Sequence, residues 1–188
     1  MAFTVILDSN ILYPAPVRDV FLELALSDLF RAKWSNLIHE EWIRSVLRDR
    51  KDIKRERLER TRDQMNAHVR DCVVSGFEHL IPTIKLKDPD DCHVVAAAVI
   101  GRADLIVTYN LKDFDEQVLK KFRLTVQHPD DFLMHLYSLA NMTVVESVSR
   151  VRARLKNPPF SAKDYLETLR RHQLTDFAEL LVAHLSEI

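Results

Sequence analysis

The chain has 188 residues, of which 47% are hydrophobic, and a formal net charge of −1, so it can build one domain with a sizeable core and has no overall basic character. Its two glycines, Gly76 and Gly101, are too few and too far apart for the phosphate-binding loops of Rossmann or P-loop proteins. Its two cysteines form no CxxC pair, and we find neither a secretory signal nor a long apolar span. We therefore expect a cytoplasmic protein in a reducing setting, with no membrane partner.

Short apolar stretches alternate with stretches of helical periodicity over the first two thirds of the chain. We expect strands at residues 3–7, 33–35, 79–82, 105–108 and 124–126. We expect helices at residues 17–29, from Ser35 or Asn36 to about Arg48, at 51–73, at 88–100 and from about 130. This alternation predicts an α/β fold with a mostly parallel sheet.

The pattern changes beyond about Asn141, where helical spacing continues and no strand is expected. The stretch Asn157-Pro158-Pro159 interrupts the chain, and Ser161 to Asp164 resembles a capping box that starts another helix. A last helix is expected from Thr175 to the end. These features predict an α/β domain over residues 1–140 and a helical extension over 141–188.

Acidic residues stand where the predicted strands and helices meet. They are Asp8 after the first strand, Glu40 and Glu41 in the second helix, Asp88, Asp90 and Asp91 before an Ala-rich helix, and Asp113 with Asn110 in the loop after residue 108. Sites in open α/β sheets lie beyond the carboxyl ends of the strands, and carboxylates there can hold a hard cation. Each acid also has an ordinary interpretation as a helix cap, a solvated helix residue or a turn residue.

The Ala-rich helix has a well-defined start. Asp88 is a typical N-cap and Pro89 a typical first helical residue, so Asp91 is expected in the first turn. Three acids exceed what capping requires. We interpret His93 as a packed or surface residue rather than a ligand, because an all-oxygen Mg²⁺ or Mn²⁺ site needs no imidazole.

The order of these motifs resembles that of the PIN domain family over roughly residues 3–135. The matching blocks are VILDSNIL, SNLIHEEW, DPDDCHVVAAAV and DLIVTYNLKDF. The resemblance assigns the acidic positions to Asp8 (with Asn10 as its companion), Glu41 and Asp91. In the fourth block Asn110 stands where many relatives have Asp, and Asp113 follows three residues later, which leaves the number of bound metals open.

The resemblance implies a three-layer α/β/α sandwich and a metal-dependent endoribonuclease. Mg²⁺ or Mn²⁺ would be held by Asp8, Glu41 and Asp91, and an activated water would hydrolyse the RNA phosphodiester bond. The helical extension makes the chain similar to VapC-type toxins, which implies a VapB-like antitoxin as partner and RNA as substrate.

Other classes of function remain as alternatives. A non-catalytic PIN-like RNA-binding or scaffold protein is the main one, favoured only by Asn110. A haloacid-dehalogenase-type phosphatase needs a second Asp two residues after the first, where this chain has Asn10. A flap nuclease of related fold usually has longer insertions.

Two surface features suggest contacts with partners. Residues 44–70 contain ten Lys and Arg against five Asp and Glu, which indicates either an RNA-backbone arm or a solvated helix. The predicted helix at residues 17–29 is apolar on more than one face, so it needs cover from an antitoxin, a second copy in a homodimer, or the chain's own C-terminal helices. We also expect the side chain of Asp8 to contribute little to packing.

Overall fold

The computed structural model describes residues 3–188 and contains a five-stranded sheet in the order β3-β2-β1-β4-β5. The strands are β1 (Thr4–Leu7), β2 (Arg31–Ser35), β3 (Val73–Val74), β4 (Leu105–Val107) and β5 (Thr125–Gln127). All four neighbouring pairs are parallel. The predicted α/β class is confirmed, and the sheet is parallel throughout.

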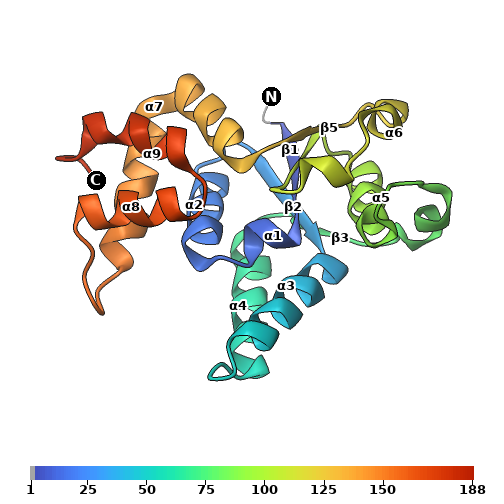
Figure 1. Cartoon of the computed structure of the whole chain (residues 1–188), viewed down its shortest axis with the longest axis horizontal. Helices are drawn as coiled ribbons and strands as arrows, with labels where there is room; N and C mark the ends of the chain where they lie inside the picture. Colours follow the sequence, from blue (N-terminus) through green and yellow to red (C-terminus); the bar gives the residue numbers. More distant parts are fainter. Residues whose placement is uncertain (1–2) are drawn as a thin grey trace.

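Helices cover both faces of this sheet. The helices that precede β3 are α1 (Ser9–Leu12), α2 (Ala15–Leu26), α3 (Asn36–Asp49) and α4 (Arg55–His68), and those between β3 and β5 are α5 (Cys92–Ile100) and α6 (Glu116–Lys121). Figure 1 shows α2 on one side of the strands and α5 on the other. The three-layer arrangement expected from the resemblance is therefore confirmed.

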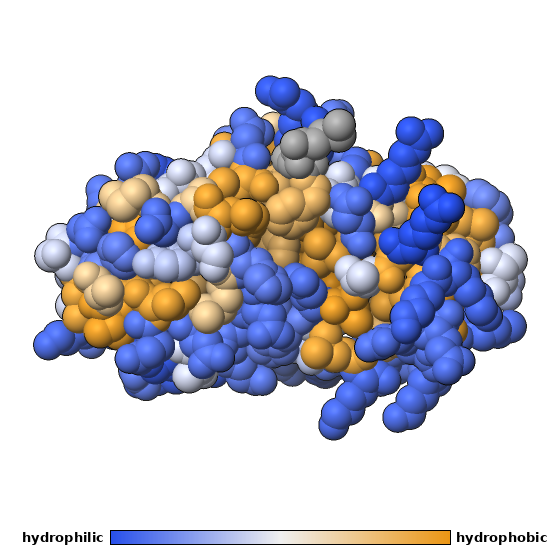
Figure 2. Space-filling view, turned by 90° about the horizontal axis from the view of Figure 1, so that it is seen from above, coloured by the Kyte–Doolittle hydropathy of each residue, from blue (hydrophilic) through white to orange (hydrophobic). Residues whose placement is uncertain are grey.

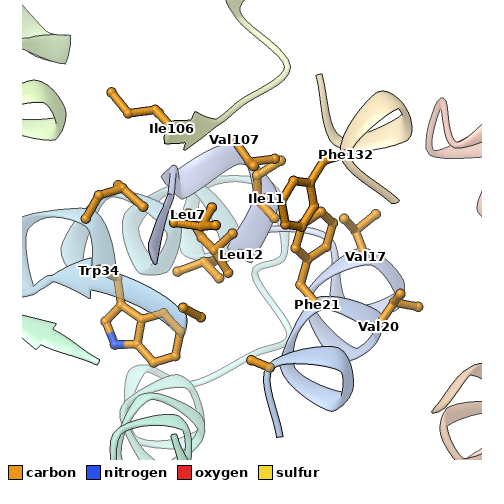
Figure 3. Close-up of a cluster of buried hydrophobic side chains, with 14 of the residues drawn as sticks. Leu7, Ile11, Leu12, Val17, Val20, Phe21, Trp34, Ile106, Val107 and Phe132 are labelled. Carbon is orange, nitrogen blue, oxygen red and sulfur yellow. The ribbon is translucent and has the colours of Figure 1, made fainter. Parts of the chain in front are cut away.

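The core on the α2 side joins the sheet to the first two helices. Figure 3 shows Leu7, Trp34 and Val107 from three adjacent strands facing side chains of α1 and α2. Leu7 pairs with Val107, and Trp34 follows the residue that pairs with Ile6, so the three side chains are in register and contribute to one layer. Phe21 of α2 stacks on Phe132 at 5.6 Å between ring centroids, which anchors the chain that follows β5 to this layer.

Three helices complete the chain: α7 (Pro129–Arg154), α8 (Ala162–Arg171) and α9 (Thr175–Leu181). The predicted capping box at Ser161 and Asp164 is present. Helix α7 has non-helical backbone angles at Ala140 (φ −153°, ψ 63°), and the side chain of Asn141 then accepts a hydrogen bond from Met142 N at 2.7 Å. The kink falls at the boundary predicted between residues 1–140 and 141–188; the division into two domains stays a prediction.

Three predicted elements differ from the structure, among them the last helix, which was expected to run from Thr175 to the end and stops at Leu181. The charged helix at 51–73 is shorter, because a turn separates α3 from α4, which begins at Arg55. The strand expected at 79–82 is wrong: residues Glu78–Thr83 form a 3-10 helix, and Pro82 has no N–H to donate to a ladder. The edge strand is instead the two-residue β3, in which Val73 pairs with Trp34.

The apolar surplus of α2 is largely covered by the chain itself. Helix α2 packs against α7 and α8. Leu22 and Leu29 are half-buried against the core, whereas Leu26 is 48% exposed. Of the three kinds of cover that the sequence allowed, the C-terminal helices are the one that the structure shows.

The outer surface mixes apolar and polar residues. Figure 2 shows hydrophobic atoms in separate patches, with long hydrophilic side chains projecting on the side of α5 and α6. No helix within residues 3–188 is both long enough and apolar enough to cross a membrane.

Candidate active site

The candidate site lies where the strand order reverses, between β1 and β4. Successive crossovers run from β1 towards β3 and then return across the sheet to β4 and β5, so the loops after β1 and β4 diverge and leave a crevice. Leu7 pairs with Val107 at the ends of these two strands. The next residues, Asp8 and Thr108, are therefore side by side at the mouth of that crevice.

Asp8 is held by a network of short hydrogen bonds. Its Oδ1 accepts from Ser9 N at 2.6 Å, and its Oδ2 accepts from Thr108 Oγ1 at 2.7 Å and from Asn10 Nδ2 at 2.7 Å. The side chain of Asn10 also accepts from Tyr109 N at 3.2 Å. Asp8 is only 3% exposed. The expectation that its side chain contributes little to packing is wrong, because this carboxylate joins β1, α1 and the β4 loop.

Burial raises the pKa of Asp8 above its usual range, and the nearby Glu41 carboxylate raises it further. The hydrogen bonds from Thr108 and Ser9 act in the opposite direction, as donors to a carboxylate do. A second carboxyl is more clearly affected. Burial and, to a smaller extent, the negative charge of Asp8 and of other nearby carboxylates raise the pKa of Asp91 to about 7.

The sequence-separated acids meet around Asp91. This residue ends a 3-10 turn, Pro89–Asp91, that leads into α5. The negative charges that raise its pKa, besides that of Asp8, belong to Asp88, Asp113 and Glu41. The carboxylates predicted from four separate blocks are thus close enough to interact. Within residues 3–188 no side chain donates a hydrogen bond to the Asp91 carboxylate or forms an ion pair with it.

Glu41 faces the cluster, whereas Glu40 faces away from it. Glu41 Oε1 lies 2.6 Å from Nε2 of His93 on α5, and Glu40 pairs with Arg55 of α4 at 3.2 Å. His93 is buried, in keeping with its interpretation as a packed residue. Through this contact His93 positions the Glu41 carboxylate. The sequence could not predict the contact, because residues 41 and 93 become neighbours only in the folded chain.

The β4 loop places its two predicted site residues differently. Asp113 is half-buried and contributes to the raised pKa of Asp91. Asn110 is exposed; its backbone N donates to Thr108 Oγ1 at 3.0 Å, and its carbonyl oxygen accepts from Asp113 N at 3.1 Å. Thr108 is not among the residues predicted for the site. The structure shows that its hydroxyl links Asp8, Asn10 and Asn110, a role signalled by its position directly after a buried strand.

The donor set suits a hard divalent cation. As the side chains lie, no three Asp, Glu, His or Cys residues of the described chain converge closely enough to form a ready-made metal site. The available donors are nevertheless all carboxylate oxygens, and the Asp91 carboxylate is half-buried among like charges without a compensating partner. A cation is the group that would compensate them.

An open groove begins at these acids. Its volume is about 660 Å³, and it is lined by Ser9, Glu41, Arg44, Ser45, Leu47, Arg48, Lys51, Asp90 and Asp91. The groove gives solvent and a ligand access to Glu41 and Asp91, whereas Asp8 lies deeper and contacts it through Ser9.

Comparison with known proteins agrees with this geometry. Residues 4–112 match the family model of the PIN domain, and residues 129–183 match that of the VapC50 C-terminal domain. No curated protein and no solved structure matches the chain significantly. The PIN match contains β1 to β4 and ends within the β4 loop. It therefore includes the crevice with Asp8, Glu41, Asp88 and Asp91. The chain belongs to the PIN domain family, as a VapC-type member with a C-terminal extension.

Proposed function

We propose that this VapC-type protein is a divalent-metal-dependent endoribonuclease and the toxin of a VapBC-like toxin–antitoxin pair. The family assignment indicates a nuclease of this type. Metal dependence is supported by the carboxylate cluster around Asp91. The pKa of Asp91 is raised, and its carboxylate has no compensating partner in the described chain. Asp8, Glu41 and Asp91 would hold Mg²⁺ or Mn²⁺.

The chain's own residues divide the work of the site. Asp8 is fixed in one orientation by Ser9, Asn10 and Thr108, so it provides a rigid anchor. Glu41 is held by the buried His93 at the entrance of the groove. When bound, the metal ion supplies positive charge against the phosphate and lowers the pKa of a coordinated water.

The two outer acids retain more freedom than Asp8. The Asp91 carboxylate accepts no hydrogen bond within the described chain and can adjust to the ligand. Asp113 completes the negative environment from the β4 loop. Asn110 is a candidate for contact with substrate, because its exposed amide adjoins the loop that Thr108 fixes.

Metal binding and RNA cleavage test the proposal together. Calorimetry should show Mn²⁺ or Mg²⁺ binding to the wild-type chain, weakened in Asp91→Asn and Glu41→Gln. The same variants should lose RNA cleavage, whereas Asp131→Asn, an exposed carboxylate on α7 that does not line the groove, should retain most of both.

The outcomes separate the two candidate functions. Metal binding that is unaltered in both site variants would refute the assignment of the ligands. A wild-type protein that binds RNA but cleaves none with either metal would favour the non-catalytic PIN-like scaffold.

A further inference from the structure

One face of α3 begins at the acidic cluster and carries positively charged side chains along the rest of its length. Glu41, Arg44, Ser45 and Arg48 follow the three- and four-residue spacing that brings helix side chains onto one face, and all four line the groove. Lys51 follows in the turn after α3 and lines the same groove. The groove is therefore acidic at one end and basic along the rest of α3.

The three cations of this face are exposed and available to a ligand. Within residues 3–188, neither Arg44 nor Lys51 forms an ion pair. Arg48 pairs only with its chain neighbour Asp49, and both side chains are exposed, so solvent screens the pair and it contributes little. Lys51 Nζ donates to Leu47 O at 3.3 Å, which keeps the ammonium against the end of the helix.

The neighbouring helix is less available, although the sequence predicted residues 44–70 as one basic arm. On α4, Arg55 pairs with Glu40 and with Glu59, and Arg62 pairs with Asp63. No residue of α4 lines the acidic groove. Only the α3 part of the basic segment is thus continuous with the candidate site.

The shape of this charge pattern selects an extended anion. A divalent cation would use the acidic end alone, and a single phosphate would not occupy three cations over two turns of helix. A polyanion with regularly spaced charges uses both ends, because its backbone can follow the cations while one phosphate reaches the acids. Nucleic-acid backbones are bound in this way by Lys and Arg.

We propose that Arg44, Arg48 and Lys51 form a track for the RNA backbone on one side of the scissile phosphate, with the strand lying along α3 towards Glu41 and Asp91. The inference rests on the proposed nuclease function and deepens it. Ser9 and Ser45 line the same groove, so the proposal offers their hydroxyls to the backbone beside the cations.

Binding of a single-stranded RNA oligonucleotide in EDTA tests the track without cleavage. The α3 variant combines Arg44→Gln, Arg48→Gln and Lys51→Gln. The α4 control combines Lys54→Gln, Arg57→Gln and Arg60→Gln, three exposed side chains that form no ion pair in the described chain. Both variants change the net charge equally, and circular dichroism checks that both remain folded.

The salt dependence of binding gives the readout. Loss of three phosphate contacts should lower the slope of log K against log salt by about 2, since each contact with a single strand contributes about 0.7. We expect this change in the α3 variant and a much smaller one in the α4 control. An unchanged slope in the α3 variant, or equal losses in both, would overturn the track.

Cleavage in Mg²⁺ or Mn²⁺ separates this inference from the function beneath it. If the wild type cleaves RNA and the salt slope of binding is the same in the wild type and the α3 variant, the track is refuted and the proposed nuclease function stands. Binding that depends on α3, with no cleavage by the wild type, would leave the track and refute the nuclease. Polyglutamate that binds α3 more tightly than RNA of equal charge would assign the surface to an acidic protein and overturn the RNA assignment.

Discussion

Asp91 is a half-buried carboxylate placed among other carboxylates, and this arrangement costs folding free energy without a counter-ion. Its pKa of about 7, against 3.8 for the ordinary group, expresses that cost. Two sources contribute: burial removes water from the carboxylate, and the surrounding acids repel its charge. A site that is unfavourable when empty is a site that gains by binding a cation.

Neutralising Asp91 should therefore stabilise the metal-free protein. We expect Asp91→Asn to have a higher melting temperature than the wild type at pH 8 in EDTA, because the substitution removes a charge that the fold disfavours. Excess Mg²⁺ should reverse the order, since the wild type binds the ion more tightly. Asp131→Asn, an exposed carboxylate on α7 that lies outside the groove, serves as the control. A destabilised Asp91→Asn protein in EDTA would contradict the electrostatic argument.

Thr108 offers a test of how Asp8 is held. Thr108→Val keeps the shape of the side chain but removes a fully buried hydroxyl that donates to Asp8 and accepts from Asn10 and from Asn110 N. Urea unfolding should show a loss of roughly 1–3 kcal/mol, the typical cost of leaving buried partners unsatisfied. Thr108→Ser retains the hydroxyl and should recover most of the stability. Equal losses in the two variants would assign the effect to packing of the methyl group.

Among the elements, the packing of α3 on β2 depends on an uncharged histidine. His39 of α3 is fully buried between two tryptophans: its Nδ1 accepts from Trp42 Nε1 at 2.9 Å, and its ring lies edge-on to Trp34. Burial lowers the pKa of His39 to about 4. The folded protein consequently resists a proton that the unfolded chain accepts readily.

This histidine should make the protein sensitive to acid. The unfolded chain binds a proton at His39 below about pH 6.5 and the folded protein only near pH 4, so stability present above pH 6.5 is lost as the pH falls between these values. The loss should reach up to about 3 kcal/mol. Urea unfolding of His39→Gln should show a smaller loss over this range. The exposed His135→Gln should behave like the wild type, and a His39→Gln protein with the same pH profile as the wild type would contradict the assignment.

Elements marked by a run of hydrophobic residues were predictable, and elements without such a run were not. Residues 3–7 and 105–108 are apolar runs bounded by polar residues, and the structure places β1 and β4 there. The two residues of β3 are too few to show any periodicity, and Leu80 and Ile81 provided a stronger apolar signal nearby. Helices α1 and α6 span only four and six residues and were not predicted. The acids could be found from their order along the chain, but the contact between Glu41 and His93 could not, because it depends on the strand order.

For the whole molecule, the open groove implies that nothing in the described chain closes over the acids. Expression of the wild type alone in bacteria should arrest growth, and co-expression of its cognate antitoxin should restore growth. Asp91→Asn should abolish the arrest. We prefer it to Asp8→Ala, because Asp8 accepts three hydrogen bonds and its loss would disturb the fold.

Protein levels and melting temperatures must accompany this test. A folded Asp91→Asn protein that arrests growth as strongly as the wild type would show that toxicity arises elsewhere.

The C-terminal extension is joined to the β4 loop by a hydrogen bond between a side chain of the loop and the backbone of the extension. Tyr109 Oη donates to the carbonyl oxygen of His172 at 2.7 Å, and the Tyr109 ring lies edge-on to His128. The tyrosine supplies a side chain, but residue 172 supplies only backbone, which every amino acid has. Substitution of residue 172 should therefore leave this hydrogen bond intact, whereas loss of the hydroxyl at position 109 removes it. The melting temperature of His172→Ala should consequently be closer to that of the wild type than the melting temperature of Tyr109→Phe. This link therefore requires a particular residue only in the PIN domain, at position 109, and the residue type at position 172 of the extension can change without breaking it.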